Sequence, residues 1–192
     1  TGFYEKEING VKQYVDGVPD GNHTLNIPQG SLNATHVHNN NPKTDENGNT
    51  FDRNVKMLSP SDLNKLLTTC STANGTNPEN AFIVMISNEG IFAISILAPI
   101  SLDEVTLKWG KFAKDFVNKS NVIISNPDGN ITYRKKSLQK LFLNGLIEMG
   151  LTNKIALFEG GVENEIDSDI NSYNIKWVKK TLERNKILET PC

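Results

Sequence analysis

Three observations predict that this chain folds as an α/β protein of the α+β type, with a mixed sheet and flanking helices. The runs Ala81–Ser87 and Ile91–Leu97 are rich in β-branched residues and are separated by a short turn that contains glycine, which is a hairpin pattern. Apolar residues recur at helical spacing in Ser101–Phe116 and Leu138–Met149. The two patterns do not alternate regularly along the chain. A length of 192 residues suits one ordinary domain, residues 1–192.

The N-terminal segment predicts a hairpin followed by a short strand. Phe3–Ile8 and Val11–Val15 flank Asn9-Gly10, and an Asn-Gly pair between two extended runs favours a tight hairpin turn. Ala34–His38 has the pattern of a further strand. The segment Asn39–Asn54 is rich in Asn and almost free of apolar residues. We therefore expect it to be an exposed loop of unusual length, acting as a mobile lid or rim.

A helix is predicted to begin at Ser59-Pro60-Ser61-Asp62. Serine is a favoured N-cap residue, and proline is tolerated at the first helical position because its missing N–H has no partner there. An acidic side chain in the first turn interacts favourably with the positive end of the helix dipole. The buried face of this helix is expected to consist of Leu63, Leu66 and Leu67.

The C-terminal half predicts two helices, a strand and a final helix. The two helices correspond to Ser101–Phe116 and Leu138–Met149, and the first of them opens with a capping box of the Ser-x-x-Glu type. Lys154–Phe158 is expected to be the last strand, and Asn174–Lys186 the final helix. Acidic residues are frequent between them, in residues 159–169, which is typical of a solvated loop.

Composition and charge exclude several classes of protein. Apolar residues make up 37% of the chain and charged residues 22%, as in ordinary globular proteins. The formal net charge of −2 leaves no basic surplus, so nucleic acid is not expected as a partner. No apolar run approaches the roughly 20 residues needed to cross a bilayer. Two cysteines are too few for a disulfide framework, and the compartment cannot be read from the sequence.

Two of the three histidines, His36 and His38, stand one residue apart within a predicted strand. Residues i and i+2 of a strand point to the same face, so both imidazoles can converge on one ion. Imidazole nitrogen suits zinc, and a catalytic zinc commonly has three protein ligands and one open position. Asp62 is the candidate third ligand because its carboxylate lies in the first turn of the helix that follows.

Each of these features also has an ordinary structural interpretation. Ser59 and Asp62 have the spacing of a common helix start, with serine as the cap and aspartate as the dipole partner. His36 and His38 could equally be two partly exposed side chains of a strand. The combination of the two motifs in one segment favours the metal site.

The combination resembles the JAMM motif of MPN-domain (JAB-like) zinc metallohydrolases, in the short form found in bacterial proteins. The matching residues are His36, His38, Ser59 and Asp62. The resemblance covers about residues 3–97 and implies an MPN/JAB-like core, related to the cytidine-deaminase fold, with residues 98–192 as a C-terminal elaboration. It also implies that zinc is the cofactor, with His36, His38 and Asp62 as its ligands and Ser59 as a donor to the oxyanion.

The resemblance further implies a glutamate that takes a proton from the water molecule activated by the metal. Glu7 matches best because Glu7-Ile8-Asn9-Gly10 resembles the Glu-x-x-Gly opening of short bacterial members, and Glu5 is the alternative. The two glutamates share one face of the predicted strand, so alternation alone does not choose between them.

The function that follows is zinc-dependent hydrolysis of a peptide or isopeptide bond, with a peptide or protein as substrate. One alternative is a non-catalytic MPN-like module that binds a peptide or protein beside the site. Another is metal-dependent hydrolysis of a bond that is not an amide. The resemblance to bacterial toxin-like proteins is compatible with secretion or with a place in a larger exported protein, and the oligomeric state is left open.

Overall fold

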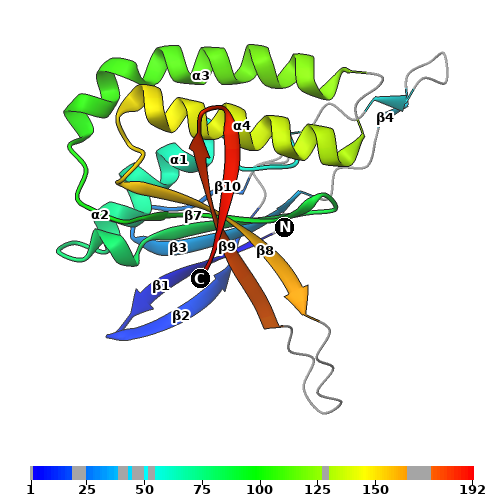
Figure 1. The fold of residues 1–192 in the computed structure, drawn as a ribbon. Coiled ribbons are helices and arrows are strands. Elements are labelled where there is room, and N and C mark those ends of the chain that lie inside the picture. Colours follow the sequence, from blue (N-terminus) through cyan, green and yellow to red (C-terminus); the bar gives the residue numbers. More distant parts are fainter. Residues whose placement is uncertain are drawn as a thin grey trace.

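The chain has an α+β fold, in which helices cover one face of an eight-stranded mixed sheet (Figure 1). This confirms the α+β class and the mixed sheet expected from the sequence. No helix in the described part of the chain is both long and apolar enough to span a membrane. The computed structural model describes residues 2–18, 25–38, 43–44, 50–51, 55–126, 130–163 and 174–192.

The sheet has the strand order β10-β9-β8-β7-β6-β3-β1-β2, and β4 pairs separately with β5. The strands are β1 (Gly2–Ile8), β2 (Val11–Asp16), β3 (Ser31–His38), β4 (Lys43–Thr44), β5 (Thr50–Phe51), β6 (Phe82–Ser87), β7 (Gly90–Ile96), β8 (Ile155–Glu163), β9 (Asn174–Glu183) and β10 (Lys186–Pro191). The α-helices are α1 (Pro60–Lys65), α2 (Ser71–Ala73), α3 (Leu102–Ile124) and α4 (Ile131–Met149).

One pair of neighbouring strands, β3 and β6, is parallel, whereas the other neighbours in the large sheet are antiparallel. A parallel pair needs a crossover connection, and α1 lies within it. A π-helical turn, Leu66–Cys70, joins α1 to α2, so these segments form one interrupted helix. The side-chain amide of Asn74, just after α2, donates to the carbonyl of Leu32 over 2.8 Å. The interrupted helix therefore runs back along β3 toward the start of that strand.

Most of the predicted elements are present. The N-terminal hairpin turns at Asn9 and Gly10, which have φ values of 54° and 78°, as a type I′ turn requires. The predicted hairpin of two apolar strands is β6 and β7, and the two amphipathic helices are α3 and α4. Most of the expected lid, Asn39–Asn54, lies outside the described residues.

The expectation of a final helix at Asn174–Lys186 is wrong, because the segment forms β9 and the start of β10. Arg184 and Asn185 adopt φ values of 45° and 62°, so a two-residue turn connects the strands. At the start of β9 the half-buried Ile175 and Trp177 alternate with the exposed Asn174 and Lys176, which is the period of a strand rather than of a helix. Pairing of β9 with both β8 and β10 then satisfies its backbone on both sides.

The core lies between the sheet and the helices. Register places Ala34, Ile83, Ile94 and Leu157 in one row across four adjacent strands, and all four side chains are buried. Helices α3 and α4 belong to the same core and pack against each other through aromatic contacts of the edge-to-face kind. These contacts join Trp109, Phe112, Phe116 and Phe142.

Two glycines in the helices have opposite surroundings. Gly145 of α4 faces the ring of Phe112 so closely that a Cβ at this position would overlap the ring carbons. Gly110 of α3 is exposed, and a Cβ there would meet nothing within 4 Å. Gly145 therefore allows α3 and α4 to approach, whereas Gly110 has no such role.

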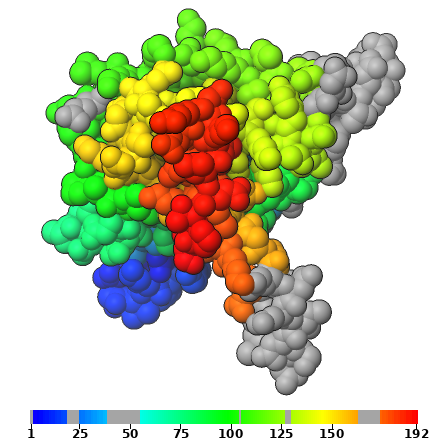
Figure 2. Space-filling model, viewed as in Figure 1, coloured from blue at the N-terminus to red at the C-terminus, as the bar shows by residue number. Residues whose placement is uncertain are grey.

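A cluster of charged groups joins α4 to the C-terminal strands. The Glu159 carboxylate of β8 accepts from Lys135 over 2.6 Å and from Gln139 over 2.9 Å, and it lies 2.8 Å from the Lys180 ammonium of β9. Lys180 also donates to Glu189 of β10 over 2.6 Å. Figure 2 shows the C-terminal strand, in red, lying against α4, in yellow and yellow-green. Glu159 therefore belongs to a strand and an ion-pair cluster, not to the solvated loop expected there.

Replacing Gly145 with alanine should lower the free energy of unfolding by about 1–3 kcal/mol, because the added methyl group overpacks the contact with Phe112. The matched change Gly110→Ala should raise it by about 0.5–1 kcal/mol through helix propensity alone. Urea unfolding of the two variants measures both effects. Equal effects of the two substitutions would contradict the packing role of Gly145.

Burial by itself raises the pKa of Glu159, but hydrogen bonds from Lys135, Lys180 and Gln139 outweigh it and lower the pKa to about 2 from an ordinary 4.5. The unfolded chain therefore takes up a proton at higher pH than the folded chain. The stabilisation from Glu159 is present above pH 4.5 and is lost as the pH falls from 4.5 toward 2.

Glu159→Gln should accordingly destabilise the protein at pH 7, by roughly 1–2 kcal/mol after allowance for partial exposure. The difference from the unsubstituted protein should shrink below pH 4.5. Thermal unfolding measured between pH 3 and pH 7 tests this, with Glu79→Gln at an exposed position as the control. A loss of stability in Glu159→Gln that does not change with pH would contradict the lowered pKa of Glu159.

Candidate metal centre

The crossover from β3 to β6 brings the start of α1 beside the end of β3. His36 and His38 are the third-last and last residues of β3, and Asp62 lies in the first turn of α1. The interrupted helix begins near His36 and runs back along the strand, so its N-terminus is held over the face that bears the histidines. The structure thus brings together four of the residues predicted from the sequence, namely His36, His38, Ser59 and Asp62.

Two of the candidate ligands, His36 and Asp62, lie close together. The Nε2 atom of His36 lies 3.5 Å from Oδ1 of Asp62, and their side chains are 8% and 12% exposed. Burial lowers the pKa of His36, and the Asp62 carboxylate opposes this effect while His38 adds to it. The net lowering favours the neutral imidazole, which is the form that can donate a nitrogen lone pair to a metal.

His38 is oriented by the backbone. Its Nδ1 atom lies 3.0 Å from the carbonyl oxygen of Val55. A carbonyl can only accept, so Nδ1 carries a proton, and in the neutral imidazole the lone pair is then on Nε2. The His36 and His38 rings lie 4.9 Å apart between centroids and are inclined by 35°. A second hydrogen bond of this kind commonly fixes the tautomer of a metal-binding histidine.

The two oxygens of the Asp62 carboxylate have different partners. Oδ2 accepts from the backbone N–H of Ser59 over 2.7 Å and from its hydroxyl over 2.8 Å. Oδ1 faces His36. The bonds to Ser59 cap the helix and at the same time fix the direction of Oδ1. Because a serine hydroxyl has one proton to donate, Ser59 in this arrangement positions Asp62 instead of donating to an oxyanion as the resemblance implies.

The separation between His36 and Asp62 suits two ligands of one zinc ion. Two atoms bound to a tetrahedral zinc at about 2.0–2.1 Å lie about 3.3 Å apart, close to the 3.5 Å between His36 Nε2 and Asp62 Oδ1. Among the described residues no three His, Cys, Asp or Glu side chains are already grouped as a complete ligand set.

The structure does not bring Glu5 or Glu7, the two candidates for the general base, to this group. Gly2 is the residue of β1 opposite His36, and Glu5 is opposite Asn33, so Glu5 points to the other face of the sheet. Its carboxylate accepts there from the side chain of Asn33 over 2.6 Å. Glu7 is exposed, shares the face of Glu5, and lies five residues along the strand from Gly2, about 16 Å away.

Two groups beside the histidines were not predicted. The Val55 carbonyl orients His38, and Ser87 of β6 is the register partner of His38. The Ser87 hydroxyl donates to the carbonyl of Lys56 over 3.1 Å, which ties the chain before α1 to the sheet. Backbone carbonyls have no residue-type signature, so only the folded arrangement could identify these groups.

Comparisons with protein-family models, with curated proteins and with solved structures find no match to this chain. Its function therefore has to be inferred from the arrangement of these side chains.

Ser59→Ala should lower the free energy of unfolding by about 1 kcal/mol, because it removes one of the two hydrogen bonds that hold Asp62 at the helix start. The matched change Ser61→Ala, at an exposed position of the same turn, should have almost no effect. Denaturant unfolding compares the two. An equal loss of unfolding free energy in the two variants would show that the hydrogen bond from the Ser59 hydroxyl does not stabilise the helix start.

Proposed function

We propose that the chain is a zinc-dependent hydrolase of the JAMM type that cleaves a peptide or isopeptide bond. In this proposal residues 3–97 form an MPN/JAB-like core, and residues 98–192 add α3, α4 and the C-terminal strands. The observation that supports it most is the pairing of His36 Nε2 with Asp62 Oδ1 at 3.5 Å, beside a second histidine whose tautomer leaves Nε2 free.

His36, His38 and Asp62 would hold the metal. Zinc bound there would supply a Lewis acid that lowers the pKa of a water molecule to about 7. The chain's own contribution is to fix its ligands before the metal arrives. Burial lowers the pKa of His36 and so favours its neutral form, the Val55 carbonyl orients the ring of His38, and Ser59 holds the carboxylate of Asp62.

The placement of Glu5 and Glu7 favours a second candidate, a non-catalytic MPN-like module that binds a peptide or protein. Catalysis by an activated water usually needs a carboxylate close to the water but outside the metal's ligands. Neither glutamate of β1 meets this requirement. The sequence between His38 and Ser59 contains three other acids, Asp45, Glu46 and Asp52, which lie outside the described residues and are the first to test.

The metal is tested first. Purified protein should bind about one zinc ion per chain in a competition titration. The double variant His36→Ala with His38→Ala should lose this binding, while His23→Ala should retain it as a matched histidine control. Asp62→Asn should weaken binding strongly, because the amide is a poorer zinc ligand than the carboxylate. Unchanged zinc affinity in the double variant would exclude both the hydrolase and a zinc-dependent module.

Hydrolysis then separates the two candidates. The zinc-loaded protein is incubated with a mixed peptide library and with isopeptide-linked peptides, and products are read by mass spectrometry. The hydrolase should give cleavage that is abolished in the double histidine variant and unchanged by Glu5→Gln or Glu7→Gln. Single changes Asp45→Asn, Glu46→Gln and Asp52→Asn identify the proton acceptor. Zinc binding without cleavage, together with retention of peptides on the immobilised protein, would favour the binding module.

A further inference from the structure

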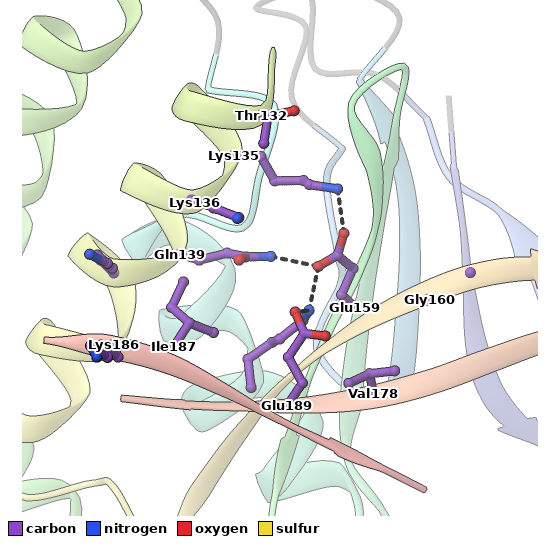
Figure 3. Close-up of a pocket in the computed structure, with 13 residues that line it drawn as sticks. Thr132, Lys135, Lys136, Gln139, Glu159, Gly160, Val178, Lys186, Ile187 and Glu189 are labelled. Atoms are coloured by element: carbon purple, nitrogen blue, oxygen red, sulfur yellow. Dashed lines mark hydrogen bonds and ion pairs between the residues drawn. The ribbon is translucent and has the colours of Figure 1, made fainter. Parts of the chain in front are cut away.

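A cleft lies between α4 and the three C-terminal strands β8, β9 and β10, apart from the candidate metal centre (Figure 3). Its volume is about 650 Å³, within the range of pockets that hold small molecules. Five lysines and two glutamates line it, so the cleft has an excess of three positive charges in a chain whose net charge is −2. Such a local surplus attracts anions.

The two glutamates are already engaged. Figure 3 shows Lys135 and Gln139 reaching from α4 to Glu159. Lys180, which is 5% exposed, lies between Glu159 and Glu189. The two carboxylates thus pair with two of the five lysines, Lys135 and Lys180. These contacts hold the four side chains in place.

The other three lysines of the cleft are Lys136, Lys140 and Lys186. Among the described residues none of them has a carboxylate within 4.0 Å. Lys136 and Lys140 are four residues apart on α4, where like charges repel, and Lys186 lines the same cleft from β10. Three lysines from two elements thus line one cleft without an ion-pair partner among the described residues.

The strand β8 leaves room for a ligand beside these groups. Gly161 lines the cleft, and a Cβ on it would meet only the carbonyl oxygen of Lys176, at 4.0 Å. Its φ is not in the left-handed region. Larger residues are therefore compatible with the backbone, and the open space beside Gly161 belongs to the cleft.

We propose that this cleft binds a compact polyvalent oxyanion, namely a soluble small molecule with about three negative charges on phosphate or carboxylate groups. Lysine ammonium groups bind such oxygens as point charges, without the fixed fork of arginine. The site is separate from the candidate metal centre. His36, Met85, Phe92 and Glu159 lie in one row across the sheet, so His36 and Glu159 are three strand spacings apart, about 14 Å.

Isothermal titration calorimetry with inorganic pyrophosphate and, separately, with citrate tests the proposal in zinc-free buffer of low ionic strength. At least one of the two should bind with one site per chain, and added salt should weaken binding. Tighter binding of pyrophosphate would identify a phosphate ligand, and tighter binding of citrate a carboxylate ligand. His36→Ala should leave the affinity unchanged, so the result does not depend on the proposed function.

The triple variant Lys136→Gln, Lys140→Gln and Lys186→Gln should bind at least ten-fold more weakly. The control triple Lys12→Gln, Lys108→Gln and Lys114→Gln changes the net charge equally at exposed positions outside the cleft and should bind almost normally.

Gly161→Leu retains every charge but fills the cleft, and it should also weaken binding at least ten-fold, with circular dichroism confirming that it folds. The proposal is overturned if neither anion binds at millimolar concentration. It is also overturned if both triple variants lose affinity equally, or if a folded Gly161→Leu variant binds as well as the unsubstituted protein.

Discussion

The parallel pairing of β3 with β6 is the constraint on which the candidate metal centre depends. Parallel neighbours cannot be joined by a tight turn, so the chain must leave the end of β3, cross one face of the sheet and return to the start of β6. The interrupted helix that begins at α1 makes this crossing. Its first turn is therefore held beside the last residues of β3, and the His36 and Asp62 side chains meet although 26 positions separate them in the sequence.

The same pairing also defines which groups share a face of the sheet. Register across β3, β6, β7 and β8 aligns two polar residues, His36 and Glu159, at the ends of a row whose middle is Met85 and Phe92. Both middle side chains are fully buried. One continuous apolar layer under the helices thus supports two polar sites, and it separates them so that each has its own electrostatic environment.

Ser59 and Asp62 show why the structural and functional interpretations of a helix start need not compete. The carboxylate that accepts from the Ser59 backbone and hydroxyl is the same carboxylate whose second oxygen faces His36. The hydrogen bonds that hold the helix start also fix the direction of the oxygen that faces His36. A side chain held in this way loses less freedom when a ligand binds to it, which reduces the entropic cost of binding.

The sequence alone determined the elements with strong local signals: the turn at Asn9 and Gly10, the start of α1, the β6–β7 hairpin and the two long helices. It also identified His36, His38, Ser59 and Asp62 as a group. Asn174–Lys186 was assigned to the wrong element because only its pairing with β8 shows that its alternation is that of a strand. Tertiary structure alone decided the rest. Strand register turns Glu5 and Glu7 away from the histidines, and it joins Glu159 to Lys180, because these contacts depend on which strands pair and not on neighbouring residues.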